Sequence, residues 1–164
     1  MSAAPLPAPA GARRISLAPE ETAAFGAALA PALAPGDVIA LEGPLGAGKT
    51  RFVTGLARGV GAAERVRSPS FTLINEYRGR LALLHADLYR VEEGEVPALG
   101  LGELGEDAVL AVEWGERLPE RLAADALRLR FEIVSDRERA IIASADAGRG
   151  LALFAAWRAI GEGA

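Results

Sequence analysis

Cysteine and glutamine are absent from this chain of 164 residues, and histidine, lysine and asparagine occur once each. Without cysteine the protein cannot form a disulfide framework, a thiolate zinc site or an iron–sulfur cluster. The single histidine, His85, excludes a metal site built from several histidines. These absences exclude several classes of function before any motif is considered.

A long hydrophobic run is missing as well. No segment approaches the ~18 apolar residues of a membrane-spanning helix, so we expect no membrane partner. Residues 1–12 contain several prolines and lack the basic region of a signal peptide, a composition typical of a disordered tail. We therefore expect a cytoplasmic protein with one folded domain at residues 13–164, a length that suits a single domain.

Charge is distributed unevenly along the chain. The formal net charge is −4, and an acidic chain is a poor binder of nucleic acid on its own, because phosphate contacts need a basic face. Residues 1–90 carry 10 basic and 7 acidic side chains, a charge of +3, whereas residues 91–164 carry 8 and 15, a charge of −7. The first part is the better place for a polyphosphate, although the acidic part can also be a simple solvated face.

The spacing of apolar residues predicts an alternation of strands and helices. Continuous apolar runs are typical of buried parallel strands, and alternating patterns late in the chain predict an antiparallel pair. The expected strands are 13–17, 37–42, 71–77, 81–85, 108–112, 127–134 and 140–145, and the expected helices are 19–33, 49–60, 117–123 and 151–160, with a short helix within 92–105. This pattern predicts an α/β fold with a mostly parallel central sheet, some antiparallel strands and helices on both faces.

A glycine-rich loop follows the apolar run at 37–42. Residues 43–50 read GPLGAGKT and match the pattern G-x-x-x-x-G-K-[ST]. In such a loop backbone N–H groups surround phosphate oxygens, the lysine reaches the outer phosphates and the hydroxyl takes a Mg²⁺ position. The expected nucleotide-binding residues here are Gly43, Leu45, Gly46, Ala47, Gly48, Lys49 and Thr50. The loop lies between an expected strand and an expected helix, so we expect one domain of the P-loop NTPase type.

Lys49 is the only lysine among 18 basic residues. An arginine can replace lysine wherever a side chain is solvated, but its planar guanidinium is larger than an ammonium. The presence of the one lysine within the glycine-rich loop therefore favours a site that needs a compact point charge.

The identity of the nucleotide follows from further absences. The guanine-reading pattern N-K-x-D cannot occur, because Asn75 is followed by Glu76 and the one lysine lies elsewhere. ATP is therefore the expected nucleotide. Without glutamine, activation of water must come from a carboxylate, the backbone or a partner.

Two acidic residues end apolar strands. Glu113 follows the run at 108–112, and Asp87 follows the run at 81–85. A P-loop site holds Mg²⁺ between the hydroxyl of the loop and an acid on a neighbouring strand. We therefore expect Thr50 and one of these two acids to hold the metal, whereas His85 is interpreted as a structural histidine.

Four motifs occur in a fixed order, namely GPLGAGKT at 43–50, SPSFTL at 68–73, HADLYR at 85–90 and VEWGE at 112–116. Together they resemble the TsaE family, also called YjeE, the ATPase subunit of the bacterial machinery for threonylcarbamoyladenosine in tRNA. The resemblance covers residues 15–133. The loop alone is generic, but the combination of four motifs is specific.

The resemblance implies a function and partners. It implies that the protein binds ATP and Mg²⁺, hydrolyses ATP weakly alone, and does not itself transfer the threonylcarbamoyl group. The implied partners are TsaD-like and TsaB-like proteins of the sugar-kinase fold, and tRNA is reached indirectly through their complex. That complex modifies the adenosine next to the anticodon in tRNAs that read ANN codons.

The resemblance also assigns roles to residues. It implies that Lys49 contacts phosphates, that Thr50 and Glu113 hold Mg²⁺, and that Lys49, Asp87 and Glu113 serve hydrolysis. Trp114 matches a functional tryptophan near the nucleotide, with core packing as the alternative for this side chain. Two other functions stay open: a small-molecule P-loop kinase, and a nucleotide-gated binding module without catalysis. The kinase is disfavoured because segment 92–107 is acidic and would make a poor phosphate lid.

Overall fold

The computed structural model describes residues 11–70 and 72–161, and its centre is a seven-stranded mixed sheet. The strand order is β1-β7-β6-β2-β5-β4-β3. The strands are β1 Arg13–Ser16, β2 Val38–Glu42, β3 Ile74–Arg78, β4 Ala82–Asp87, β5 Ala108–Glu113, β6 Leu127–Ile133 and β7 Arg139–Ser144. The expected α/β fold is confirmed, and each strand overlaps its predicted range.

Parallel and antiparallel pairing are separated within the sheet. The four central strands, β6, β2, β5 and β4, pair in parallel. The outer pairs β1–β7, β7–β6 and β3–β4 are antiparallel. The buried, continuously apolar runs form β2, β4 and β5, as expected for strands covered on both faces, whereas the central strand β6 alternates in burial.

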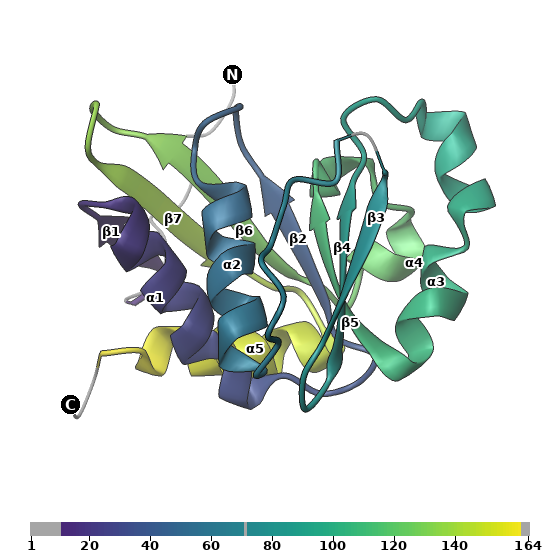
Figure 1. Ribbon diagram of the computed structural model, residues 1–164, viewed down its shortest axis with the longest axis horizontal. Coiled ribbons are helices and arrows are strands. Elements are labelled where there is room, and N and C mark those ends of the chain that lie inside the picture. The colour runs from purple at the N-terminus through teal and green to yellow at the C-terminus, as the bar shows by residue number, and fades with distance from the viewer. Residues whose placement is uncertain (1–10, 71, 162–164) are drawn as a thin grey trace, which may run out of the picture.

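Helices cover both faces of the sheet (Figure 1). On one face lie α1 Pro19–Leu29, α2 Lys49–Gly59 and α5 Gly148–Ala159, which share one buried cluster with β2, β6 and β7. The other face is covered by short elements that share a second cluster with β2, β4 and β5. They are α3 Leu101–Leu104 and α4 Glu120–Ala123, with 3₁₀ turns at Glu93–Leu99, Gly105–Asp107 and Gly115–Arg117; a further 3₁₀ turn, Ala30–Ala32, extends α1.

Helices α1 and α2 approach each other very closely. A Cβ built on Gly55 would lie 1.8 Å from the carbonyl oxygen of Ala23, and one on Gly26 would lie 2.3 Å from the carbonyl oxygen of Phe52. Only hydrogen fits at these two positions, so the two backbones pack directly. This contact fixes α2, whose first turn carries the lysine and threonine of the glycine-rich loop.

The C-terminal helix closes the first core. The Trp157 ring is fully buried against Phe25 and Phe52, with ring centroids 5.9 and 6.1 Å away. Its indole N–H donates to the carbonyl of Ala12 at 2.8 Å. Of the tail expected at 1–12, residues 1–10 lie outside the described residues, and Ala12 is buried in the folded part.

Several boundaries differ from the sequence-based expectation; helix α4, for example, begins at Glu120 rather than residue 117, because Gly115–Arg117 forms a 3₁₀ turn. Strand β3 begins at Ile74 rather than residue 71, because Leu73 has a left-handed φ of 68° and donates its N–H to Pro69 in a turn. Helix α5 begins at Gly148, three residues early, and its N-cap residue Ala147 makes no side-chain cap that a sequence pattern could reveal. Among the described residues, no helix has the length and apolar character needed to cross a membrane.

Candidate functional site

The carboxyl ends of three parallel strands meet at one edge of the sheet. Strand β2 leads into the glycine-rich loop, and Asp87 at the end of β4 is the register partner of Glu113 at the end of β5. Ligands of open parallel sheets bind at this edge. The topology therefore brings the loop and both predicted acids together.

The glycine-rich loop turns sharply into α2. Gly48 is the N-cap residue of that helix and has a left-handed φ of 103°, a conformation that glycine adopts without strain. Lys49 and Thr50 are then the first two residues of α2, where backbone N–H groups have no partner within the helix. The helix N-terminus and the lysine present positive charge to the same place, which suits a phosphate.

Thr50, Glu113 and His85 form a connected chain of hydrogen bonds. The Thr50 hydroxyl donates to the Glu113 carboxylate, with Oγ1 3.1 Å from Oε2 and 3.3 Å from Oε1. His85 Nε2 lies 2.6 Å from the same Oε2. His85 Nδ1 is buried and has no partner among the described residues, so a proton on Nε2 that donates to Glu113 satisfies the ring better. His85 therefore holds Glu113 in place.

Lys49 is almost completely buried and lies against Trp114. Its Nζ donates to the carbonyl of Gly43 and lies 4.7 Å from the centroid of the Trp114 ring. Such a cation over an indole face is attracted by the ring. Tyr89 packs on the same ring at a centroid distance of 5.0 Å. Trp114 lines the cavity described below and also packs against the buried cluster of β2, β4 and β5.

Asp87 has weaker partners than Glu113. One carboxylate oxygen, Oδ1, accepts the backbone N–H of Tyr89 at 2.9 Å. Among the residues that the structure describes, the other oxygen, Oδ2, has only a long contact of 3.5 Å with the hydroxyl of Ser70, which is itself bonded to Ser68 at 2.7 Å. Asp87 is therefore a mostly buried carboxylate with one oxygen open to a further donor.

These groups open onto a cavity of about 650 Å³. Of the predicted site residues, those that line it are Leu45, Gly46, Gly48, Lys49, Thr50, Asp87, Glu113 and Trp114. Gly43 and Ala47 do not line it. Gly43 holds the lysine through its carbonyl and packs on β6 at Phe131, and Ala47 is fully buried.

Sequence reasoning missed several residues of this cavity. They are Leu17, Ala18 and Pro19 before and at the start of α1, Thr22 in its first turn, and Asp136, Arg137 and Arg139 in and after the β6–β7 turn. No motif marks these residues, because they reach the glycine-rich loop through tertiary contacts: α1 packs on α2, β6 pairs with β2, and β1 pairs with β7. Arg139 contacts the loop directly, donating from Nη2 to the carbonyl of Gly46 at 3.3 Å.

Glu116 is a further acid close to the lysine. Its own burial, followed by the nearby Glu42 carboxylate, raises the pKa of Glu116, and Lys49 and Arg117 offset part of that rise. The acid belongs to the motif VEWGE at 112–116, so the resemblance pointed to the segment but not to this electrostatic role.

The donor set suits a hard divalent cation. The Thr50 hydroxyl and the Glu113 carboxylate are oxygen ligands, which Mg²⁺ prefers, and Mg²⁺ usually keeps waters and substrate phosphates as its other ligands. Among the residues that the structure describes, no group of three or more His, Asp or Glu side chains could hold a metal by itself. A metal at Thr50 and Glu113 would therefore need phosphate oxygens and water to complete its shell.

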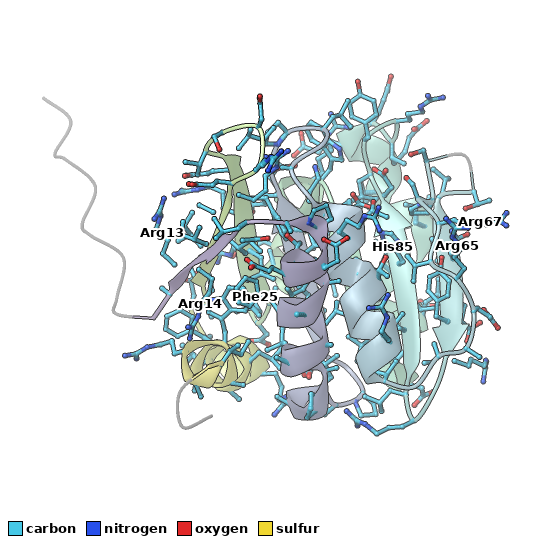
Figure 2. The ribbon with its side chains drawn as sticks, turned by 60° about the vertical axis from the view of Figure 1, so that its left-hand side comes forward. Arg13, Arg14, Phe25, Arg65, Arg67 and His85 are labelled. Carbon is cyan, nitrogen blue, oxygen red and sulfur yellow. The ribbon has the colours of Figure 1, made fainter. Side chains whose placement is uncertain are left out.

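Two pairs of arginines lie on different sides of the molecule. Arg13 and Arg14 lie on β1 at one side of the molecule, and Arg65 and Arg67 lie at the opposite side (Figure 2).

Comparisons with known proteins agree on one family. The profile of the family described as threonylcarbamoyl adenosine biosynthesis protein TsaE matches residues 17–141. The chain is 44% identical to the tRNA threonylcarbamoyladenosine biosynthesis protein TsaE of Bacillus subtilis, over 80% of this chain and 84% of that protein. It is 38% identical to the protein of the same name from Treponema pallidum, over 79% and 97% of the two chains.

A solved structure has the same fold. The crystal structure of Bacillus subtilis YdiB matches with a TM-score of 0.73 and 37% sequence identity, over 88% of this chain and 92% of that one.

Proposed function

Because the chain belongs to the TsaE family, we propose that it is a Mg²⁺-dependent ATPase subunit of the pathway that makes threonylcarbamoyladenosine in tRNA. The observation that carries the proposal is the arrangement of Lys49, Thr50, Glu113 and Asp87 around one cavity. Its relatives carry the name of that pathway.

The phosphates of ATP would be held by the start of α2. Backbone N–H groups of the glycine-rich loop would donate to phosphate oxygens, and the Lys49 ammonium would leave the Gly43 carbonyl to reach the outer phosphates. Trp114 keeps that ammonium close to the cavity when no phosphate is present. The lysine is therefore positioned before the nucleotide arrives, which lowers the cost of ordering it on binding.

Thr50 and Glu113 would hold the Mg²⁺. The bound ion would neutralise charge on the phosphate oxygens during phosphoryl transfer. The hydrogen bond between the two side chains places both oxygen donors at one point, and His85 keeps the Glu113 carboxylate from turning away.

Asp87 is the better candidate to accept a proton from the attacking water. Glu113 already accepts hydrogen bonds from Thr50 and His85, whereas Oδ2 of Asp87 has only the 3.5 Å contact with Ser70. A general base must have an oxygen free to reach its proton. We therefore assign metal binding to Glu113 and water activation to Asp87.

The partners are proposed from the family. In the cytoplasm, the ATPase would bind a complex of TsaD-like and TsaB-like proteins. It would reach tRNA indirectly, through that complex. The net charge of −4 and the separated arginines support indirect access to tRNA. The acidic segment 92–107 lines no part of the cavity, so nothing here supports the phosphate lid of a small-molecule kinase.

Phosphate release with and without purified TsaD-like and TsaB-like proteins tests the proposal. We expect Mg²⁺-dependent release that the partners stimulate, and we expect Lys49→Ala to abolish it because the phosphate contact is lost. Arg58→Ala is the matched control, since Arg58 is an exposed cation in the last turn of the same helix. Unchanged turnover in Lys49→Ala would refute the phosphate role, and production of ADP only with a small-molecule acceptor would indicate a kinase.

A further inference from the structure

Arg117 lies outside the cavity, yet its guanidinium is bonded to the turn that follows Asp87. The side chain is half-buried and does not line the cavity. One nitrogen, Nη1, donates to three carbonyls of the turn, at 2.8 Å to Leu88, 2.9 Å to Tyr89 and 2.9 Å to Val91. Three carbonyl oxygens that converge on one point repel one another, so a cation that donates to all of them stabilises this turn.

One peptide group connects Arg117 to Asp87. The carbonyl of Leu88 accepts from Arg117, and the N–H of the same peptide group, which belongs to Tyr89, donates to Oδ1 of Asp87 at 2.9 Å. Because this peptide group is planar and trans, its C=O and N–H point in opposite directions. A donor that fixes the carbonyl therefore also fixes the direction of the N–H at Asp87.

Arg117 is itself held in place by the central sheet. It ends the 3₁₀ turn Gly115–Arg117, which lies just beyond β5. Gly115 packs against β2, where a Cβ on this residue would lie 2.6 Å from the Cβ of Ala40. The Arg117 guanidinium also lies 5.6 Å from the centroid of the Trp114 ring. Arg117 is therefore a fixed support for the turn beyond β4.

The two acids of the site differ in how much they depend on this support. Glu113 is held within the site by the side chains of Thr50 and His85. Among the described residues, the only hydrogen bond to the carboxylate of Asp87 shorter than 3.5 Å comes from the Tyr89 N–H. If that N–H turned away, the Asp87 carboxylate could rotate, and Oδ2 would no longer keep one orientation.

We propose that Arg117 is a positioning residue for water activation, because it holds the Leu88–Tyr89 peptide so that the N–H occupies Oδ1 of Asp87 and leaves Oδ2 for the attacking water. The inference rests on the proposed function, since it takes Asp87 to be the base of ATP hydrolysis. Arg117 does not line the cavity, so it acts through the peptide and not by contact with the nucleotide.

Steady-state ATP hydrolysis in saturating Mg²⁺ tests this role. Arg117→Met keeps the apolar stem of the side chain but removes every donor, and we expect kcat to fall about 10- to 100-fold, the scale of a misplaced reacting group. KM for ATP should stay within about twofold, because the phosphate contacts are unchanged. Arg117→Lys supplies an ammonium with three N–H donors for the three carbonyls, so it should recover kcat to within about fivefold of the parent.

A double variant separates positioning from a general structural effect. If Arg117 acts through Asp87, its loss matters only while the carboxylate is present. Arg117→Met combined with Asp87→Asn should therefore hydrolyse ATP within about twofold of the rate of Asp87→Asn alone. Arg121→Met is the matched control, since Arg121 is an exposed arginine of the following helix α4 and does not line the cavity. It should leave kcat and KM unchanged.

Thermal unfolding checks that each variant folds. Arg117→Gln, whose side chain is too short to reach the three carbonyls, is a second variant that should behave like Arg117→Met. An unchanged kcat in these variants, a rise in KM as large as the fall in kcat, or no recovery with lysine would overturn the positioning role. A double variant slower than Asp87→Asn by the full factor of the single change would overturn it as well. Absence of Mg²⁺-dependent hydrolysis in the unaltered protein would overturn the proposed function itself.

Discussion

The buried hydrogen bond between His85 and Glu113 makes a sharp prediction for His85→Phe. The histidine is fully buried, and its Nε2 lies 2.6 Å from the carboxylate of Glu113. Phenylalanine fills a similar volume but cannot donate. Glu113, which is only 5% exposed, would keep the Thr50 hydroxyl as its one side-chain donor.

The magnitude follows from two opposing terms. Loss of a hydrogen bond to a charged group costs about 1.5–3 kcal/mol. The substitution also removes Nδ1, which is buried without a partner among the described residues. Its removal offsets part of the lost stability, on the order of 1 kcal/mol. We therefore expect the free energy of unfolding to fall by about 1–2 kcal/mol, which in a chain of this size lowers Tm by about 2–8 °C.

Urea unfolding and thermal melts of the isolated protein measure this change. His85→Gln is the matched control, because its amide can donate from a similar distance and should restore part of the stability. The same pair of variants should also differ in the Mg²⁺ concentration needed for half-maximal ATP hydrolysis, which rises when Glu113 is no longer held. A His85→Phe protein as stable as its parent would refute the view that the ring supports Glu113.

Three other substitutions test the role of Asp87, the contact between α1 and α2, and the electrostatics of Glu116. Asp87→Asn keeps an acceptor for the Tyr89 N–H but removes the proposed base, so phosphate release should slow about 10²- to 10⁴-fold at unchanged ATP affinity. Gly55→Ala should lower the free energy of unfolding by about 1–3 kcal/mol or more in urea titration, since its Cβ would meet the Ala23 carbonyl at 1.8 Å. Glu116→Gln should raise stability at neutral pH by up to about 0.5 kcal/mol, because this exposed acid has a raised pKa. A raised pKa means that folded Glu116 binds its proton more tightly than unfolded Glu116 does. The contribution of this residue to stability is therefore most favourable below pH 4.5 and falls as pH rises through the pKa of the folded state. Thermal melts should show that the gain in stability from Glu116→Gln vanishes in acid.

Each of these changes has a control. Asp107→Asn alters an exposed acid before the amino end of β5, opposite the site, and should leave turnover unchanged. Gly94→Ala adds a methyl group with no atom within 4 Å and should be nearly neutral. An equal loss of ATP affinity and turnover in Asp87→Asn would indicate a structural role, and a gain from Glu116→Gln that persists at pH 4 would contradict the electrostatic explanation.

Local patterns predicted the elements that form the edge of the sheet at the glycine-rich loop. The continuous apolar runs could be identified as central parallel strands because burial on both faces removes the need for polar side chains. The motif GPLGAGKT indicated a phosphate loop because glycine spacing and the turn into a helix are properties of neighbouring residues. Glu113 and Asp87 could be found because a strand-end acid is also a local feature.

Other parts of the site depend on contacts between distant segments, which local patterns do not encode. Leu17 and Arg139 lie 122 positions apart and meet only through the pairing of β1 with β7. The hydrogen-bond partner of His85 could not be predicted from the sequence either. A histidine in an apolar strand predicts a buried ring but does not identify the Glu113 carboxylate beside it. Sequence by itself therefore determined the phosphate loop and the chemistry of its neighbours, because a motif spans a few residues. Only the tertiary structure shows that Glu113 accepts hydrogen bonds from Thr50 and His85 while one oxygen of Asp87 has a single long contact with Ser70, because these contacts depend on strand order and register.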